Sequence, residues 1–411
     1  MRAYARLTRD RLPTTIFPYW LRISRDDVAG GYRLRDDIMR SPVRAAARSL
    51  RHGRRPSPPE EKELVSQARL VWVFAHGHRR EHDDGTALLD ASHRGRQFLL
   101  DHHLDHERGG YRWSTDRVGQ PRNDVKVLYA QSFVIYAFVE LSRASGSREP
   151  LDDALELFRV IERELRDEHN GGWREHAHGD WSPLRADDAR PGMAFPGRKS
   201  ANALVHWMEA LTALYEEVPD PAVRRALVEA VELCHDRVFP ADPGATHEVF
   251  LPDWRPDRGG EQRASYGHNV EQAWLLLHAR DALGEARDWE RLHTYVEHAL
   301  RVGFDHRRGG AFTWGHGDEP AVGREKIWWV QCELMIALTE ALLDRADERY
   351  ERALAQTVTF VEQSMTDRRD GILLESVHED GRRRYARKSG NWKAGYHDVR
   401  AATRIAEAFA P

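Results

Sequence analysis

A short, glycine-rich segment recurs along the chain, and this repeat constrains the fold more than any other feature of the sequence. Several copies are followed by alternating residues with aromatic side chains, as in Tyr111-Arg112-Trp113. Paired glycines adopt positive φ angles at low cost, and alternation is typical of a short β-hairpin. Intervals of roughly 50–90 residues leave room for two helices per copy. The copies have the form Asp-x-x-x-Gly-Gly, or a close variant, and lie at 26–31, 105–110, 167–172, 257–260, 305–310 and, in degenerate form, 367–371.

The sequence between these segments has the periodicity of paired helices. Within a pair, one helix is more apolar, such as 127–141, and the next is more charged, such as 155–166. An inner ring buried on both sides and an outer ring half exposed to solvent would produce this contrast. We therefore predict an all-α fold, an (α/α)6 barrel in which six helical hairpins close into a toroid, with short β-hairpin loops on one face. Helical spacing occurs in the ranges 59–79, 86–104, 124–145, 150–167, 199–217, 221–238, 268–284, 286–303, 325–343, 345–365 and 393–409, with a twelfth candidate near 10–24.

The length of 411 residues is large for one ordinary core, which stops growing near ~250–300 residues. A closed toroid can exceed that limit as one unit, and no long linker divides the chain. We therefore predict a single barrel domain over residues 1–411. The segment 41–61, rich in Arg and Pro, and the segment 180–199 are the candidate mobile loops.

Charge and hydropathy exclude several classes of partner. The 62 basic and 66 acidic residues give a net charge of −4, which offers no bulk attraction to nucleic acid or to membranes. The apolar runs are far shorter than the ~20 residues of a membrane span. Two cysteines cannot build a disulfide scaffold, and no apolar signal core opens the chain. We expect a cytoplasmic protein, monomeric or homodimeric, that binds neither nucleic acid nor membranes.

Histidines are numerous, at 22, but their spacing does not indicate a metal site. The chain has no His-Glu-x-x-His and no Cys-x-x-Cys motif, so we interpret two clusters of histidines as solvated surface. It also has no Gly-x-Gly-x-x-Gly, P-loop or Gly-x-Ser-x-Gly motif, so nucleotide and serine-hydrolase chemistry lack support. The two clusters are His76, His78 and His82, and His102, His103 and His106.

Three other histidines lie beside aromatic residues on predicted inner helices. His206 and His268 each have a glutamate three residues later, Glu209 and Glu271. On a helix this spacing places both side chains on one face, where the carboxylate can orient the imidazole. One such histidine is more often a satisfied core residue. Together with His397, on the same side of a toroid, they indicate a site.

An arginine and several tryptophans complete the candidate residues. Arg69 lies inside an apolar helical stripe; it either forms a structural ion pair or stabilises an oxyanion. Trp254, Trp314, Trp329 and Trp392 lie at predicted loop–helix junctions. Aromatic faces at a cavity mouth suit the apolar faces of sugar rings, so a sugar is the expected ligand.

Five motifs follow one another in the order and approximate spacing of a known family. They resemble the N-acylglucosamine 2-epimerase superfamily, and within it the cellobiose 2-epimerase branch. The resemblance implies an (α/α)6 barrel and interconversion of aldoses at C2, or of aldose and ketose, without a metal or organic cofactor. The motifs are Ala68-Arg69-Leu70-Val71-Trp72, Tyr129-Ala130-Gln131-Ser132-Phe133, Ser265-Tyr266-Gly267-His268, Trp328-Trp329-Val330-Gln331 and the segment 392–397.

Residue by residue, the resemblance implies His268 and His397 as the acid/base pair. It implies Arg69 as the residue that faces the substrate oxygens, and His206 as a supporting hydrogen-bonding histidine. The residues that it implies as packing against the sugar or lining the pocket are Trp329, Trp392, Tyr129, Asn202 and Glu271.

The implied reaction is 2-epimerisation at the reducing-end aldose of a mono- or disaccharide, of the cellobiose or mannose–glucose type, through ring opening and a cis-enediol(ate). Three alternatives stay open. Return of the proton to C1 would give an aldose–ketose isomerase, such as a mannose isomerase. Two of Glu209, Glu271 and Glu333 could serve a glycoside hydrolase on the same barrel. A non-catalytic sugar-binding protein is the third alternative.

Overall fold

The computed structural model describes residues 1–34, 61–83, 85–185, 187–188, 195–257, 263–385 and 387–409. The candidate mobile loop 41–61 lies outside these residues except for Glu61, and 180–199 lies outside them at 186 and 189–194. Of the repeat copy at 257–260, only Asp257 is described.

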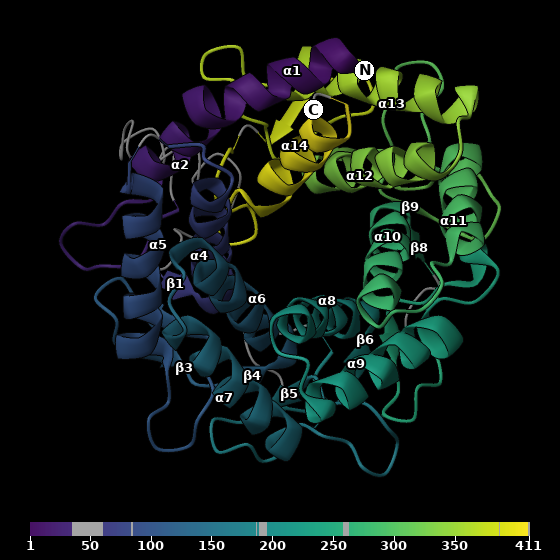
Figure 1. Ribbon diagram of the computed structural model, residues 1–411. Helices are drawn as coiled ribbons and strands as arrows, with labels where there is room; N and C mark the ends of the chain where they lie inside the picture. The colour runs from purple at the N-terminus through teal and green to yellow at the C-terminus, as the bar shows by residue number, and fades with distance from the viewer. Residues whose placement is uncertain are drawn as a thin grey trace.

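Six inner helices of the described chain form a closed ring, and a second ring of helices surrounds it (Figure 1). This arrangement confirms the predicted (α/α)6 barrel. The inner helices are buried along most of their length; in α6, almost every residue from Leu128 to Leu141 is buried. The inner helices are α4 (Leu64–Arg79), α6 (Leu128–Ser145), α8 (Ala201–Glu217), α10 (Tyr266–Ala282), α12 (Trp328–Asp344) and α14 (Tyr396–Phe409).

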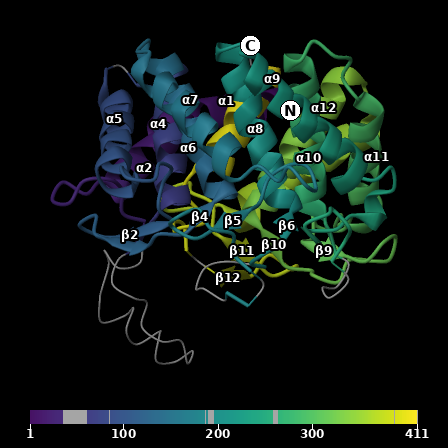
Figure 2. The same cartoon turned by 90° about the horizontal axis from the view of Figure 1, so that it is seen from below.

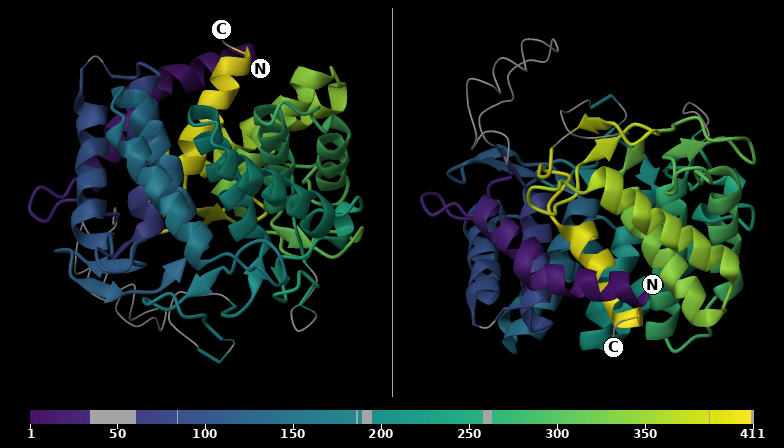
Figure 3. Two further views of the ribbon diagram at one scale, coloured as in Figure 1. Left: turned by 60° about the horizontal axis from the view of Figure 1, so that its bottom comes forward. Right: turned by 90° about the horizontal axis from the view of Figure 1, so that it is seen from above.

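The outer helices carry one buried stripe and one exposed face, as their mixed composition predicts. The ring closes through the N-terminal helix α1 (Arg2–Arg11), which lies across α14 from the other end of the chain (Figure 3). A π-helical turn joins α1 to α2 (Phe17–Ser24), so the helix predicted near 10–24 begins earlier than expected. The other outer helices are α5 (Ala87–Phe98), α7 (Glu149–Glu164), α9 (Pro221–Leu233), α11 (Trp289–Val302) and α13 (Glu348–Phe360).

Short antiparallel strands precede five of the inner helices and gather on one face of the barrel (Figure 2). They explain why the predicted helices 59–79 and 124–145 begin too early, since residues 61–63 and 126–127 are strands. Strands β1, β4, β8 and β10 each pair with a strand that follows the next glycine segment, whereas the partner of β6 precedes the segment at 257–260. The sheets are β1 (Glu61–Glu63) with β2 (Ser114–Asp116) and β3 (Pro121–Asn123), β4 (Lys126–Val127) with β5 (His176–Ala177), β6 (Lys199–Ser200) with β7 (Val249–Phe250), β8 (Ala264–Ser265) with β9 (Trp314–Gly315), and β10 (Lys326–Ile327) with β11 (Ser376–Val377) and β12 (Arg383–Tyr385).

A buried ion pair ties five of the six glycine segments to a lysine that precedes an inner helix. The aspartate that opens the segment accepts backbone N–H groups of its own turn, as Asp105 does from Glu107 and Arg108. Its other oxygen binds a lysine next to an inner helix. Because the pair recurs, these five segments have equivalent links to the residues that precede an inner helix. The Nζ–Oδ2 distances are 3.3 Å for Lys62–Asp26, 3.0 Å for Lys126–Asp105, 2.8 Å for Lys199–Asp167, 2.8 Å for Lys326–Asp305 and 3.3 Å for Lys388–Asp367.

Two histidines that we assigned to solvated surface are in fact buried. The side chain of His103 packs against Phe98, and its Nδ1 lies 3.1 Å from the carbonyl oxygen of Arg112. His76 stacks on Trp72 and lies against a buried carboxylate. The surface assignment is therefore wrong for both. Their burial is tolerated because a hydrogen bond to a buried acceptor offsets the cost of removing each ring from water.

Within the described residues, no helix combines the length and the apolar character that crossing a membrane requires.

Candidate active site

The predicted site residues lie at the same level of different inner helices. Tyr129, Asn202, Trp329 and His397 are each the second residue of their helix, and His268 is the third residue of α10. Because the strands hold these helix starts on one face of the barrel (Figure 2), side chains distant in sequence are brought around one axis.

His397 is the more deeply buried member of the predicted acid/base pair. Its Nδ1 lies 2.6 Å from Oε1 of Glu333, whose other oxygen accepts a hydrogen bond of 3.1 Å from the indole of Trp274. Burial lowers the pKa of His397 well below its ordinary value, and the positive charges of Arg69 and Arg400 act in the same direction. At neutral pH the imidazole is therefore uncharged, with its Nε2 lone pair free to accept a proton.

The pKa of His268 is shifted in the opposite direction. Its Nδ1 lies 2.8 Å from Oε2 of Glu248. Burial alone would lower the pKa of His268, but the charge and the hydrogen bond of Glu248 outweigh this effect and raise the pKa above its ordinary value. The more distant carboxylates of Glu271 and Glu333 act in the same direction as Glu248. His268 is therefore protonated more readily than His397, so the pair could supply one proton donor and one proton acceptor.

The indole of Trp329 contacts both imidazoles. Its ring centroid lies 4.7 Å from that of His268 and 5.9 Å from that of His397. Gly267 permits this position, because a β-carbon there would lie 2.6 Å from the indole. Solvent reaches the His268 side of the site, where the side chain is 23% exposed, whereas that of His397 is 8% exposed.

Arg69 is a buried guanidinium that forms no ion pair within the described residues. It donates to the hydroxyl of Tyr129 at 2.8 Å and to the carbonyl oxygen of Trp392 at 3.3 Å, and its Nε has no partner. Its positive charge lies over the ring of Phe133 at 4.3 Å. Of the two functions that the sequence left open, the contacts favour an anion-stabilising group over a structural ion pair.

The predicted His-x-x-Glu pairing holds for only one of its two histidines. Nδ1 of His206 lies 2.8 Å from Oε2 of Glu209, as predicted. Glu271 instead binds Arg400, and Glu248 takes the expected position beside His268. Helical spacing places Glu271 near the same face, but the guanidinium offers its carboxylate a stronger partner than an imidazole already bonded elsewhere.

Arg400 links the carboxylates beneath the site. Its Nη1 lies 2.7 Å from Glu209, and its Nη2 lies 2.5 Å from Glu271 and 2.8 Å from Glu333. Burial would raise the pKa of Glu209, but chiefly the charge of Arg400, with the hydrogen bond to His206, lowers it to about 2. One guanidinium thus compensates the negative charges beneath both His206 and His397.

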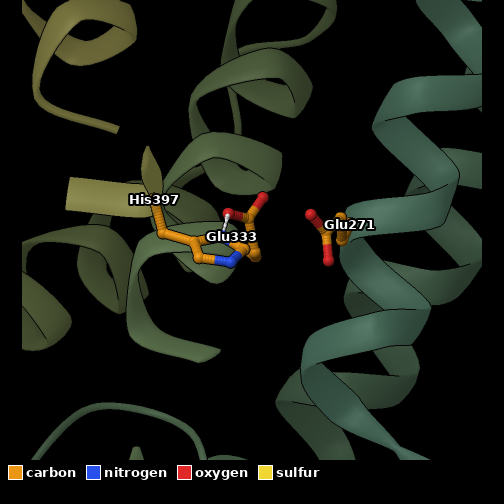
Figure 4. Close-up of side chains that lie close together, drawn as sticks. All are labelled: Glu271, Glu333 and His397. Carbon is orange, nitrogen blue, oxygen red and sulfur yellow. Dashed lines mark hydrogen bonds and ion pairs between the residues drawn. The ribbon is translucent and has the colours of Figure 1, made fainter. Parts of the chain in front are cut away.

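Three of these side chains could also be considered as metal ligands. Glu271, Glu333 and His397 point toward one another, with one donor atom of each within 4.8 Å of the others (Figure 4). However, Arg400 already binds Glu271 and Glu333, so a cation of the protein supplies the charge that a metal ion would bring. The two carboxylates that a metal ion would need are therefore already paired with Arg400.

The aromatic candidates occupy different parts of this face. The indole of Trp392, which is 52% exposed, lies 6.5 Å from that of Trp113 and 6.3 Å from the ring of Tyr129. Trp314 lies on β9, where Arg263 covers its indole at 4.3 Å. Trp392 therefore lies beside Arg69, whereas Trp314 lies in the β8–β9 sheet.

The remaining predicted residues also fall around the axis or near it. Asn202 lies near the hydroxyl of Tyr129, where it opposes the burial that raises the pKa of Tyr129. Trp254 lies farther out, where its indole donates to the carbonyl oxygen of Gly171.

Comparison with known proteins identifies the family. The family model described as N-acylglucosamine 2-epimerase (GlcNAc 2-epimerase) matches residues 48–401. The chain belongs to this family. Its members are carbohydrate 2-epimerases, that is, isomerases, and the resemblance stated from the motifs is thus confirmed.

Near-full-length relatives support the same assignment. The cellobiose 2-epimerase of Ruminococcus albus is 27% identical over 407 residues, which cover 97% of each chain. The solved structure of cellobiose 2-epimerase from Spirochaeta thermophila matches with a TM-score of 0.83 at 26% identity, covering 99% of this chain and 97% of that one. A D-mannose isomerase matches with a TM-score of 0.81 at 20% identity over 99% of this chain and 98% of that one, which shows a shared fold.

Around this candidate site, sequence reasoning missed three residues. Glu248 lies in a hairpin distant in sequence from His268, so no local spacing could reveal it. Arg400 lies three residues after His397 on the predicted helix, and that spacing could have indicated it. Trp274 lies three residues after Glu271 and resembled an ordinary core aromatic.

Proposed function

We propose that the protein is a cofactor-independent carbohydrate 2-epimerase that acts at C2 of a reducing-end aldose, of the cellobiose or mannose–glucose type. The observation that carries the proposal is the pair formed by His268 and His397, which face the same indole with pKa values shifted in opposite directions. The names of the relatives support the reaction and the class of sugar.

The reaction begins with ring opening, because the C1 aldehyde acidifies the hydrogen on C2. The neutral His397 accepts this proton at Nε2, and the electron pair moves through C1 to O1. The imidazolium of His268 then donates a proton to the opposite face of C2, which restores the aldehyde and inverts the configuration. After product release, His397 loses a proton and His268 regains one from water.

The enediolate carries negative charge on its oxygens, and the site offers fixed cationic and donor groups for it. Arg69 is buried with an unpartnered Nε, and the hydroxyl of Tyr129 lies 2.8 Å from its Nη2. His206 presents its second nitrogen, since Glu209 occupies Nδ1. Such prearranged groups stabilise a developing anion more than water does.

The contacts weigh differently on the three alternatives. A hydrolase needs two available carboxylates, whereas Glu209, Glu271 and Glu333 all bind Arg400. A purely binding protein gives no reason for two imidazoles in opposite protonation states. Isomerisation needs only that the proton return to C1, so it is the second candidate; the shared fold with a D-mannose isomerase is consistent with it.

NMR of the sugar incubated with the protein in D₂O separates these functions. Cellobiose and mannose are each tested, and we expect the C2 epimer with deuterium at C2. A ketose product would indicate the isomerase, cleavage of cellobiose would indicate a hydrolase, and unchanged sugars would reject catalysis on them.

A further inference from the structure

Glu248 is a carboxylate that the backbone holds rigidly at the edge of the site. Its carbonyl oxygen accepts the first N–H of α8, from Ala201, at 3.0 Å. The next residue, Val249, pairs with Ser200 in the β6–β7 sheet. The main chain is thus held at Glu248 and at the next residue, and the carboxylate lies 2.8 Å from Nδ1 of His268.

The two histidines have unequal carboxylate partners. Glu333, beside His397, is fully buried and shares its charge with Arg400 at 2.8 Å. Glu248 is 30% exposed, and within the described chain His268 is its one cationic partner. Glu248 therefore presents its whole charge to His268, whereas Arg400 offsets the charge that Glu333 presents to His397.

The other groups around His268 do not replace Glu248. Glu271 faces it from α10 and Glu333 from α12, but both are bound to Arg400. The uncharged indole of Trp329 contacts the rings of both His268 and His397. The Nδ1 hydrogen bond to Glu248 is thus the direct contact that favours the charged ring.

We propose that Glu248 is a positioning residue of the reaction, which holds the His268 ring through Nδ1 and keeps it as the imidazolium that donates the proton to C2. The inference rests on the proposed epimerase function. It assigns a role to a residue that touches the proton donor and not the sugar.

The test is the pH dependence of kcat/KM for the Glu248→Gln variant, an isosteric change that removes the charge and keeps an amide against the ring. In the wild type, the acidic limb follows His397 and the basic limb follows His268, because the first must be neutral and the second charged. Without Glu248, burial lowers the pKa of His268 unopposed by its direct partner. We expect the basic limb to move to lower pH by about 1–3 units. At a pH above both limbs, kcat/KM of the variant should then be about tenfold below that of the wild type for each unit of the move.

Two further variants complete the design. Glu248→Asp keeps the charge on a shorter side chain, so its basic limb should stay near the wild-type position while the rate falls. Glu375→Gln is the matched control, because the carbonyl oxygen of Glu375 accepts the first N–H of α12 at 3.1 Å while its carboxylate pairs with Arg387. That variant should have the wild-type profile.

An NMR titration of the His268 ring gives a readout that does not depend on turnover. The pH at the midpoint of this titration should be lower in Glu248→Gln than in the wild type, and it should be unchanged in Glu375→Gln. A basic limb and a midpoint at their wild-type positions in Glu248→Gln would overturn the role of Glu248 and leave the epimerase function standing. Absence of turnover by the wild type would instead reject the proposed function, while the titration would still decide the effect of Glu248 on His268.

Discussion

Replacing Arg400 by glutamine tests the charge balance beneath the site. The guanidinium is buried and binds Glu209, Glu271 and Glu333 at 2.5–2.8 Å. Removing one partner of a buried ion pair costs about 3–5 kcal/mol, because it leaves uncompensated charge in the interior. We expect Arg400→Gln to lower the free energy of unfolding at pH 7 by at least this amount.

The loss should depend on pH in a defined direction. Arg400 helps to lower the pKa of Glu209 to about 2, so this carboxylate stabilises the fold fully only above its ordinary pKa, and the contribution disappears as the pH falls toward 2. In acid the wild type therefore loses the stability that the Arg400–Glu209 pair contributes, whereas the variant lacks this contribution at every pH. The difference between the two proteins should be smaller at pH 3 than at pH 7.

Urea unfolding followed by circular dichroism measures both effects. Arg349→Gln is the control, because Arg349 also pairs with two carboxylates, Asp347 and Glu297, but on the surface. Its free energy of unfolding should match that of the wild type. Equal stability of the Arg400 and Arg349 variants at pH 7 would refute the reasoning that one guanidinium compensates three buried carboxylates.

Three other outcomes follow from the same contacts. His268→Ala and His397→Ala should each lower kcat by at least about 10²–10⁴-fold with unchanged circular dichroism; near-full activity in either would reject the acid/base pair. Dialysis against a chelator should leave the rate unchanged, because Arg400 holds the carboxylates, whereas loss restored by a divalent metal would contradict this. All six lysines are at most 3% exposed, so an amine-reactive acetylating reagent should leave all six unmodified in the native protein, as read by mass spectrometry. Rapid native acetylation of any lysine would contradict the buried ion pairs.

The fold was predictable because its signals are local and repeated. The Asp-x-x-x-Gly-Gly segments and the helical periodicity each recur, so an error in one copy does not change the architecture. The helix boundaries were less predictable. Lys126 and Val127 continue the apolar pattern of α6, but they pair with β5 as a strand, and that pairing depends on a hairpin about fifty residues away, at 176–177.

The site was predictable where a residue carries its chemistry in its own neighbourhood. His206 and Glu209 are one helical turn apart and are bonded as expected. His268 and Glu271 have the same spacing but are not bonded to each other. The difference arises from Arg400 and Glu248, which reach the site from other repeats, and no single-sequence spacing encodes such long-range competition.

The repeat nevertheless shows where function departs from structure. In five hairpins, one residue accepts the first N–H of an inner helix through its carbonyl oxygen, so its backbone is equivalent in each copy and its side chain is free to vary. At this position Glu248 contacts His268, Trp113 packs near Trp392, and Glu375 binds Arg387. The lysine–aspartate pairs, by contrast, are nearly identical in five copies. The lysine and aspartate positions keep one residue type, so they serve the structure that the repeats share. The position of Glu248, Trp113 and Glu375 changes residue type, so it supplies the contacts that differ around the axis.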